Sequence, residues 1–413
     1  MTQQLFYNAN IYSPMDKGRP LSGKAQGELA FFFKGALLVE NGLIAAVGDG
    51  QAVRAAAQAM GEVDKTDCEG RCMVPGFVDP HTHMCFATLR EAEFSLRMQG
   101  TPYLEILRQG GGILSSVKAV AAASDHELYL NTLRHVHTAL RLGTTTLEVK
   151  SGYGLDTENE LKMLRVINQV AQDTPLDIVA TFMGAHAVPE TYKTDSDAFI
   201  TMVIEQMLPK VKQQGIARFC DVFCETGVFT LDQSRRLLLA AQAMGFGIKL
   251  HADEVTDLGG AGLAAELQAC SADHLLAASR ANINAMAKAG VIAVLLPATA
   301  YSLRKPYARA QLMIENKVPV ALATDCNPGS SFTESMQFVF GLAVLNMQMS
   351  VAQALTAATL NAAYAVNMAD RVGSLDKGKQ ADFLLLEGDS PAILAYHAGV
   401  SSVVKVYKKG KPV

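Results

Sequence analysis

The feature that most constrains the fold of this 413-residue chain is a repeated alternation of amphipathic helices and short apolar strands. From Ser124 onward, each stretch with apolar residues at helical spacing is followed by a short run typical of a buried strand. This alternation is typical of parallel sheets, in which a helix carries the chain back to begin the next strand. The chain offers eight such strands: a run that ends at His81 and His83, then residues 144–150, 177–183, 217–224, 247–250, 271–274, 291–296 and 320–324.

Helix boundaries support this order of elements. Ser124 and Glu127 have the spacing of a capping box, and Gly143 stands where a helix is expected to stop. Thr157 and Glu160 predict a second capping box. Eight strands alternating with helices predict a (β/α)₈ barrel of the TIM type. A doubly wound open sheet is the alternative, but no G-x-G-x-x-G sequence opens a helix after an early strand.

The two ends of the chain have a different pattern. Residues 1–70 contain strand-like segments with a hairpin signal at Asn41-Gly42, and residues 370–413 contain further strand-like segments. We therefore expect a small β-sandwich domain built from residues 1–70 and 370–413. Residues 71–369 would form the barrel domain.

Composition narrows the class of protein. Hydrophobic residues make up 49% and charged residues 18%, as in a soluble globular enzyme, and the net charge of −4 offers no attraction to nucleic acid or anionic membranes. No apolar run is long enough to cross a bilayer, and the start does not resemble a signal peptide, so a cytoplasmic protein is expected. The seven cysteines include no C-x-x-C pair and are expected to stay reduced. A small molecule is the expected partner.

Histidines and a carboxylate follow the predicted strands where a barrel collects its chemistry. Residues i and i+2 of a strand point the same way, so His81 and His83 can hold one metal ion between them. His251 ends the fifth strand and Asp325 follows the eighth. Three imidazoles and one carboxylate suit zinc, or an iron ion of similar demand, with one position open for water. The predicted metal ligands are His81, His83, His251 and Asp325.

A metal ion in this position favours hydrolysis, because it makes water nucleophilic at neutral pH. Glu254, three residues after His251, is placed to take a proton from that water and pass it to a leaving nitrogen. His274, at the end of the sixth strand, is placed to bond the same water or the developing oxyanion. The predicted catalytic residues are Glu254, His274 and Asp325.

Further polar residues surround the expected mouth of the barrel. Arg90 falls in a loop after His83, and a guanidinium can hold a carboxylate with two parallel hydrogen bonds. The aromatic ring of Tyr153 follows the second strand, the imidazole of His186 follows the third, and a polar turn follows Asp325. These groups suit an anionic heterocyclic substrate. The predicted substrate-binding residues are Arg90, Tyr153, His186, Glu254, Asn327, Gly329 and Ser330.

Taken together, these residues resemble the amidohydrolase superfamily, and within it the hydrolases of histidine degradation. The motifs are Pro75-Gly-Phe-Val-Asp-Pro-His-Thr-His83, Arg90, Lys150-Ser-Gly-Tyr-Gly-Leu155, Met183-Gly-Ala-His186, His251-Ala-Asp-Glu254, Ala272-Asp-His-Leu275 and Asp325-Cys-Asn-Pro-Gly-Ser330. The resemblance implies hydrolysis of 4-imidazolone-5-propanoate to N-formimidoyl-L-glutamate by one zinc or iron ion per subunit, in a homodimer. It also implies that Tyr153, His186, Asn327, Gly329 and Ser330 contact the substrate.

Related hydrolases with two metals use a lysine at the end of strand four. Here that strand ends at Cys224 and Glu225, whereas Lys150 ends strand two, so one metal is favoured and Glu225 is the residue that could support a second.

Two other functions stay open from the sequence. One is a deaminase of the cytosine or guanine type, which would leave Arg90 without an anionic partner. The other is a barrel that has lost catalysis and serves as a scaffold, which the complete ligand set disfavours.

Overall fold

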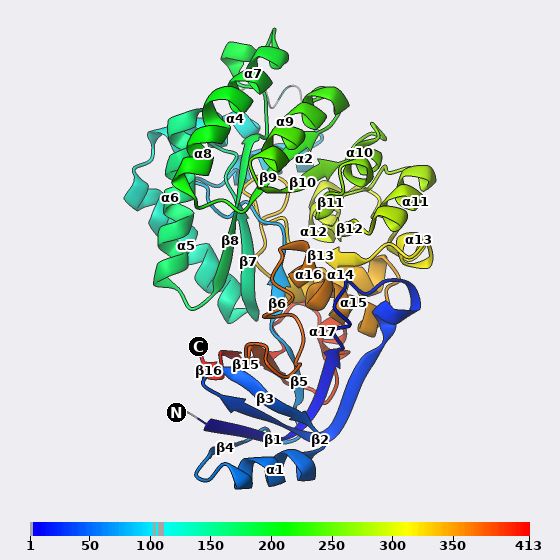
Figure 1. Cartoon of the computed structure of the whole chain (residues 1–413). Helices are drawn as coiled ribbons and strands as arrows, with labels where there is room; N and C mark the ends of the chain where they lie inside the picture. Colours follow the sequence, from blue (N-terminus) through cyan, green and yellow to red (C-terminus); the bar gives the residue numbers. More distant parts are fainter. Residues whose placement is uncertain (1–2, 102–104, 106–110) are drawn as a thin grey trace.

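The central part of the chain forms a parallel eight-stranded barrel in this computed structural model, which describes residues 3–101, 105 and 111–413 (Figure 1). The strands stand side by side in the order of the sequence, each parallel to the next. The predicted barrel is therefore confirmed. Its strands are β6 (Phe77–Asp79), β7 (Thr144–Lys150), β8 (Asp177–Ala185), β9 (Phe219–Cys224), β10 (Gly247–Ala252), β11 (Ser271–His274), β12 (Ile292–Leu295) and β13 (Val320–Leu322).

Hydrogen bonds beyond the strand ends bring the first and last strands together. Asp325 N donates to the His81 carbonyl at 3.1 Å, and His83 N donates to the Cys326 carbonyl at 2.9 Å. Just before these residues in the chain, the Asp79 carboxylate accepts hydrogen bonds from the backbone N–H and the hydroxyl of Thr324. The segments after β6 and β13 are thereby held next to each other.

The prediction that His81 and His83 lie on a strand is wrong. The apolar run divides at Gly76 into β5 (Cys72–Pro75), which belongs to another sheet, and β6, which ends at Asp79. A Cβ atom at position 76 would lie 2.3 Å from Thr145 Oγ1, so the close approach of β7 requires glycine here. Both histidines lie in the irregular segment that follows β6.

Helices surround the barrel (Figure 1). The capping box of Ser124 and Glu127 is confirmed. The second predicted box is wrong, because Asp156 caps the next helix and Glu160 binds elsewhere. The helices after β6 are α2 (Glu91–Met98), α4 (Ile113–Ala122), α5 (Asp125–Arg141), α6 (Thr157–Asp173), α7 (Ser196–Met202), α8 (Leu208–Gln214), α9 (Leu231–Ala243), α10 (Gly260–Glu266), α11 (Arg280–Ala289), α12 (Pro297–Leu303), α13 (Ala310–Glu315), α14 (Met336–Asn346), α15 (Val351–Ala358), α16 (Leu360–Ala365) and α17 (Ile393–Tyr396).

Both chain ends contribute to a second, separate sheet at the other end of the barrel from its mouth (Figure 1). The predicted hairpin at Asn41-Gly42 is confirmed, and both residues have positive φ. One face buries a cluster of the aromatic rings of Phe6, Phe383 and Tyr407, and α1 (Gly50–Ala59) packs against this sheet. The strands, besides β5, are β1 (Gln3–Pro14), β2 (Leu29–Glu40), β3 (Leu43–Gly48), β4 (Asp64–Asp67), β14 (Phe383–Leu386), β15 (Val403–Lys408) and β16 (Lys411–Pro412).

The sheet from both chain ends agrees with the predicted fold class. Because β5 pairs with β1 and β14, the sheet continues past residue 70, and the boundaries at 70 and 370 stay a prediction. All seven cysteines are described and none forms a disulfide. Among the described helices, none has both the length and the apolar character needed to span a membrane.

Candidate metal centre and active site

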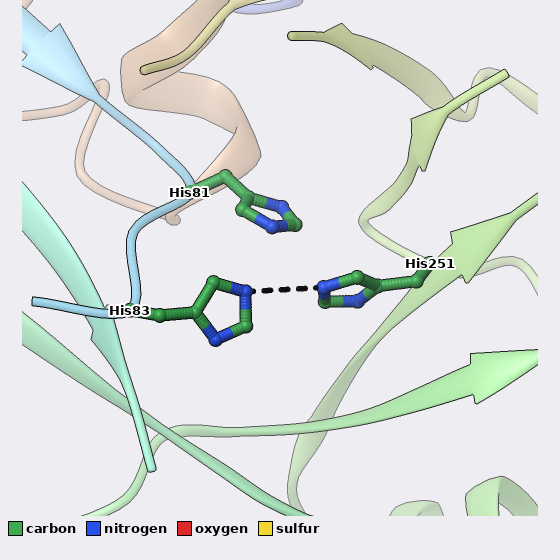
Figure 2. Close-up of side chains that lie close together, drawn as sticks. All are labelled: His81, His83 and His251. Atoms are coloured by element: carbon green, nitrogen blue, oxygen red, sulfur yellow. Dashed lines mark hydrogen bonds between the residues drawn. The ribbon is translucent and has the colours of Figure 1, made fainter. Parts of the chain in front are cut away.

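The four predicted ligands meet at the mouth of the barrel. His81 and His83 follow β6, His251 lies in β10 and Asp325 follows β13. Figure 2 shows the three imidazole rings turned toward one another, with 3.2 Å between the Nε2 atoms of His83 and His251. Asp325 Oδ1 lies 3.5 Å from His81 Nε2 and 3.6 Å from His83 Nε2. Ligand atoms of the three histidines lie within 4.8 Å of one another, which is close enough to share one ion.

Hydrogen bonds at Nδ1 orient two of the three rings, those of His81 and His251. Burial holds the pKa values of His81 and His83 well below the usual histidine range, so both rings are neutral at pH 7. His81 Nδ1 lies 2.6 Å from Asp273 and His251 Nδ1 lies 3.1 Å from Asp221. We assign the Nδ1 protons to these contacts, which leaves Nε2 to bind a metal. Among the described residues, the buried Nε2 of His81 has no hydrogen-bond partner.

Burial and a neighbouring carboxylate shift the pKa values of two of these side chains. Burial raises the pKa of the Asp325 carboxyl above its ordinary value. Burial alone would lower the pKa of His251, but the Asp221 carboxylate outweighs it and raises that pKa. The donor set and the buried Nε2 of His81, which lacks a hydrogen-bond partner among the described residues, fit a metal ion.

Below the ligands, the barrel encloses a cluster of charged side chains. Lys150 Nζ lies 2.7 Å from Glu148 and 2.8 Å from Asp221, and all three side chains are fully buried. Burial alone would lower the pKa of Lys150, but Asp221 and Glu148 raise it above its ordinary value. Lys249 donates to the Pro80 carbonyl at 2.6 Å, just before the two histidines. The cluster thus fixes Asp221, which orients His251, and the segment that carries His81 and His83.

Lys150→Met is expected to lower the free energy of unfolding by about 3–5 kcal/mol, because it leaves Glu148 and Asp221 buried with one cation fewer. The urea midpoint of the metal-free protein measures this loss. Lys193→Met is the matched control, since Lys193 pairs with Glu190 on the surface and both side chains are more than two-thirds exposed. Equal midpoints for the two variants would contradict the account of the buried cluster.

The two predicted proton-handling residues lie together beside the ligands. Glu254 follows β10, and its Oε1 is 3.6 Å from His274 Nδ1. The His274 ring centroid lies 5.1 Å from that of His251 and 5.4 Å from that of His81. Atoms of His81, His274 and Asp325 also form a group within 4.8 Å. A water molecule at the ligands would thus be close to both Glu254 and His274.

On the opposite side, Tyr153 and His186 line the mouth. The His186 ring stacks on His83 with centroids 4.8 Å apart, and Tyr153 lies 5.3 Å from His186. His186 Nδ1 lies 2.9 Å from the Gly152 carbonyl, and burial lowers the pKa of His186 to about 3. His186 is therefore neutral at pH 7, with Nδ1 donating to Gly152.

The loop that carries Tyr153 is held by Glu160, whose role differs from the predicted capping box. Its buried carboxylate accepts bonds from Gly152 N at 3.1 Å, Gly154 N at 2.8 Å and Leu155 N at 3.0 Å. A carboxylate on α6 therefore fixes the loop after β7. The sequence analysis did not predict this contact. The available signal was that Glu160 lies four residues after Asp156, a polar residue able to cap the helix in its place.

The third part of the rim is the turn after Asp325. Asn327 Oδ1 accepts bonds from Gly329 N and Ser330 N, each at 2.8 Å, and Asn327 Nδ2 donates to the Asp325 carbonyl at 2.7 Å. The backbone donors that the sequence offered to a ligand are thus engaged within the turn. Asn327 shapes the turn next to Asp325, the proposed metal ligand.

Arg90 lies against this turn. A Cβ atom at Gly329 would overlap the Arg90 guanidinium, so only glycine leaves room for the arginine. Among the described residues, Arg90 Nε and Nη1 are buried without a hydrogen-bond partner, and Glu93 is 3.9 Å from Nε. Arg90 and Gly329 line a cavity of about 260 Å³ together with aromatic side chains of Phe94 and Phe332. The guanidinium can therefore receive an anionic group.

The fold and site agree with comparisons to known proteins. The model of the amidohydrolase family matches residues 72–413. A 5-methylcytosine deaminase from Klebsiella pneumoniae has a TM-score of 0.74 at 16% identity, covering 99% of this chain and 98% of that one. An adenosine deaminase from Xanthomonas campestris with bound zinc has a TM-score of 0.71 at 18% identity, covering 100% and 92%. These structures are similar in fold, and the chain belongs to the amidohydrolase family.

Comparison with curated relatives identifies the group within this family to which the chain belongs. The chain is 73% identical to the imidazolonepropionase of Desulfotalea psychrophila over the full length of both proteins. It is 59% identical to that of Syntrophobacter fumaroxidans, covering 100% of this chain and 97% of the relative. It is 47% identical to that of Phocaeicola vulgatus, covering 98% of each. Within the family, the chain groups with the imidazolonepropionases.

Proposed function

We propose that this protein hydrolyses 4-imidazolone-5-propanoate to N-formimidoyl-L-glutamate, the third step of histidine degradation. The observation that carries this proposal is the 73% identity, over the whole length of both chains, to a protein named imidazolonepropionase. The residues at the barrel mouth offer the chemistry for such a reaction. The two deaminases of similar fold are only 18% and 16% identical to this chain and therefore support no substrate.

His81, His83, His251 and Asp325 would hold one zinc or iron ion per subunit. Their Nε2 atoms and the Asp325 carboxylate form the donor set that such ions prefer. When bound, the ion lowers the pKa of water and polarises the ring carbonyl. Asp273 and Asp221 keep His81 and His251 in the tautomer that this binding requires.

Glu254 carries the proton in this proposal. As water adds to the ring carbonyl carbon, Glu254 takes its proton, and the bond from that carbon to the adjacent ring nitrogen then breaks. Glu254 returns the proton to the departing nitrogen, which becomes part of the formimidoyl group. His274, 3.6 Å from Glu254, bonds the carbonyl oxygen as negative charge develops there.

The rim orients the substrate. Arg90 would hold the propanoate group in a paired contact, since two of its guanidinium nitrogens lack partners among the described residues. Tyr153 and His186 would contact the imidazolone ring from the opposite side. Glu254 would contact the ring from the side of its leaving nitrogen, and Asn327, Gly329 and Ser330 would close the pocket.

Arg90→Ala is expected to raise KM for the imidazolone acid roughly 100-fold, because about 3 kcal/mol of charge-assisted hydrogen bonding is lost. Arg90→Lys should fall between this variant and the wild type, since an ammonium keeps the charge but not the paired geometry. Initial rates against substrate concentration measure the change. An unchanged KM in Arg90→Ala would exclude the carboxylate contact.

The reaction itself is tested by following the loss of imidazolone ultraviolet absorbance with the metal-loaded protein, before and after a chelator. We expect turnover that the chelator abolishes and that zinc or ferrous iron restores. Cytosine and guanine should release no ammonia under the same conditions. Inactivity toward the imidazolone acid, or deamination of either base, would contradict the proposal.

We also propose that the protein is a cytoplasmic homodimer, as its resemblance to the family implies. Light scattering of the purified protein should give twice the chain mass of 44.1 kDa. Cell fractionation should recover it with the cytoplasmic enzymes.

A further inference from the structure

Glu225, which the sequence offered as a possible support for a second metal, faces a different loop. It follows β9, is 4% exposed, and accepts bonds from the loop that follows β10. Its Oε2 accepts bonds from Val255 N at 2.8 Å and Thr256 N at 3.3 Å, and its Oε1 from Thr256 Oγ1 at 2.5 Å and Thr226 N at 2.7 Å. In the described chain, no lysine, arginine or histidine pairs with it. The carboxylate is therefore used as a backbone acceptor.

A second carboxylate fixes the same loop from its other end. Asp253 accepts bonds from Gly259 N at 3.0 Å, Gly260 N at 2.8 Å and Ala261 N at 3.0 Å, at the start of α10. The Asp253 carbonyl accepts a further bond from Ala277 N. Asp253 has φ of +50°, a conformation that non-glycine residues adopt only when their surroundings hold them there.

Glu254 lies between these two anchors. No hydrogen bond joins its side chain to another described residue, and its Oε1 lies 3.6 Å from His274 Nδ1. The side chain is 15% exposed and borders a cavity of about 290 Å³, so space is open on one side of the carboxylate. The direction of the Glu254 carboxylate therefore depends on the backbone of residues 253 and 255.

We propose that Glu225 is a positioning residue, which holds Val255 and Thr256 so that the Glu254 carboxylate stays directed at His274 and the reacting water. The proposal rests on the proposed function, in which Glu254 carries the proton. A misplacement of about 1 Å in a reacting group can cost 100-fold in rate, so a buried anchor one residue away has a large effect on catalysis. An ionised acceptor suits this task, because hydrogen bonds to charge are roughly twice as strong as neutral ones.

Glu225→Gln tests the proposal, since it keeps the shape but turns an NH₂ group toward backbone N–H donors. We expect kcat to fall roughly 10- to 100-fold with KM within about twofold of the wild type. Metal content and the thermal unfolding midpoint should stay close to those of the wild type. Asp195→Asn, which alters an exposed carboxylate that caps α7 through one backbone bond, is the control and should leave kcat unchanged.

A double-mutant cycle separates positioning from general structure. In a Glu254→Gln background, Glu225→Gln should lower kcat by less than about twofold further, because the group that it positions no longer carries the proton. The same loss in both backgrounds, or a rise of KM in place of the fall of kcat, would overturn the proposal. So would wild-type kcat in Glu225→Gln when Glu254→Gln is impaired, whereas full activity of Glu254→Gln would contradict the proposed function itself.

Thr256→Val gives a second route should Glu225→Gln fail to fold. This variant removes the hydroxyl that donates to Glu225. Thr256 is exposed, so the substitution leaves the buried core intact. We expect kcat to fall about 3- to 10-fold with unchanged KM, since the hydroxyl's bonds to Glu225 and to Thr226 Oγ1 are lost while the backbone bonds to Glu225 remain. That loss should also disappear in the Glu254→Gln background, and persistence there would refute the role of Glu225.

Discussion

Glu254→Gln should bind metal and substrate like the wild type and turn over about 10²–10⁴ times more slowly. An amide of the same shape cannot accept the proton of water or return it to the ring nitrogen. Glu254 lies 3.6 Å from His274 and is no ligand of the proposed metal, so neither the fold nor the ligand set should change. Metal content by elemental analysis, together with kcat and KM from imidazolone absorbance, checks each part of this expectation.

Glu266→Gln is the matched control for this variant. Glu266 pairs with Arg235 on the surface of the barrel, and its side chain is about half exposed. Its substitution should leave both kcat and KM unchanged. Turnover of Glu254→Gln close to that of this control would mean that another group carries the proton, and His274 would become the first residue to test.

His83→Ala is expected to lose the metal ion and to lower activity more than about 10³-fold, because one of three imidazoles is removed from the site. Asp273→Asn should have a smaller effect. It keeps all four proposed ligands and weakens the bond that orients His81, which costs roughly 10- to 100-fold in metal affinity. Titration of metal-free protein with zinc measures both changes.

A larger loss of zinc affinity in His83→Ala than in Asp273→Asn distinguishes a metal site from a structural histidine cluster. His137→Ala, at an exposed position on α5, is the control and should bind zinc like the wild type. If His83→Ala retained tight zinc binding, the ligands would have to be sought elsewhere on the chain.

Much of the fold could be predicted from the chain, because short-range patterns determine it. The strands at residues 144–150 and 271–274 have the predicted bounds, and the capping box at Ser124 is present. That the four proposed ligands lie together could also be predicted, since the ends of parallel strands meet at one mouth. His81 and His83 do converge, although the reason given for them was wrong: they follow the strand, and the hydrogen bonds to the end of β13 direct them.

What could not be predicted depends on contacts between distant segments. Asp221 is a charged residue inside the apolar strand β9, and only the folded barrel brings it to Lys150 on β7. Glu160 was assigned to a helix cap because local spacing fitted, but the neighbouring loop offers it three backbone donors. Glu225 faces a loop that follows a different strand. In each case the sequence shows a charged residue, but it does not show which group that residue contacts in the fold.

The most direct test of the central claim is anomalous diffraction from a crystal of the protein loaded with zinc. The account predicts one strong peak within about 2.3 Å of His81 Nε2, His83 Nε2, His251 Nε2 and the Asp325 carboxylate. A peak at any other group of residues, or none near these four side chains at full zinc occupancy in solution, would contradict it.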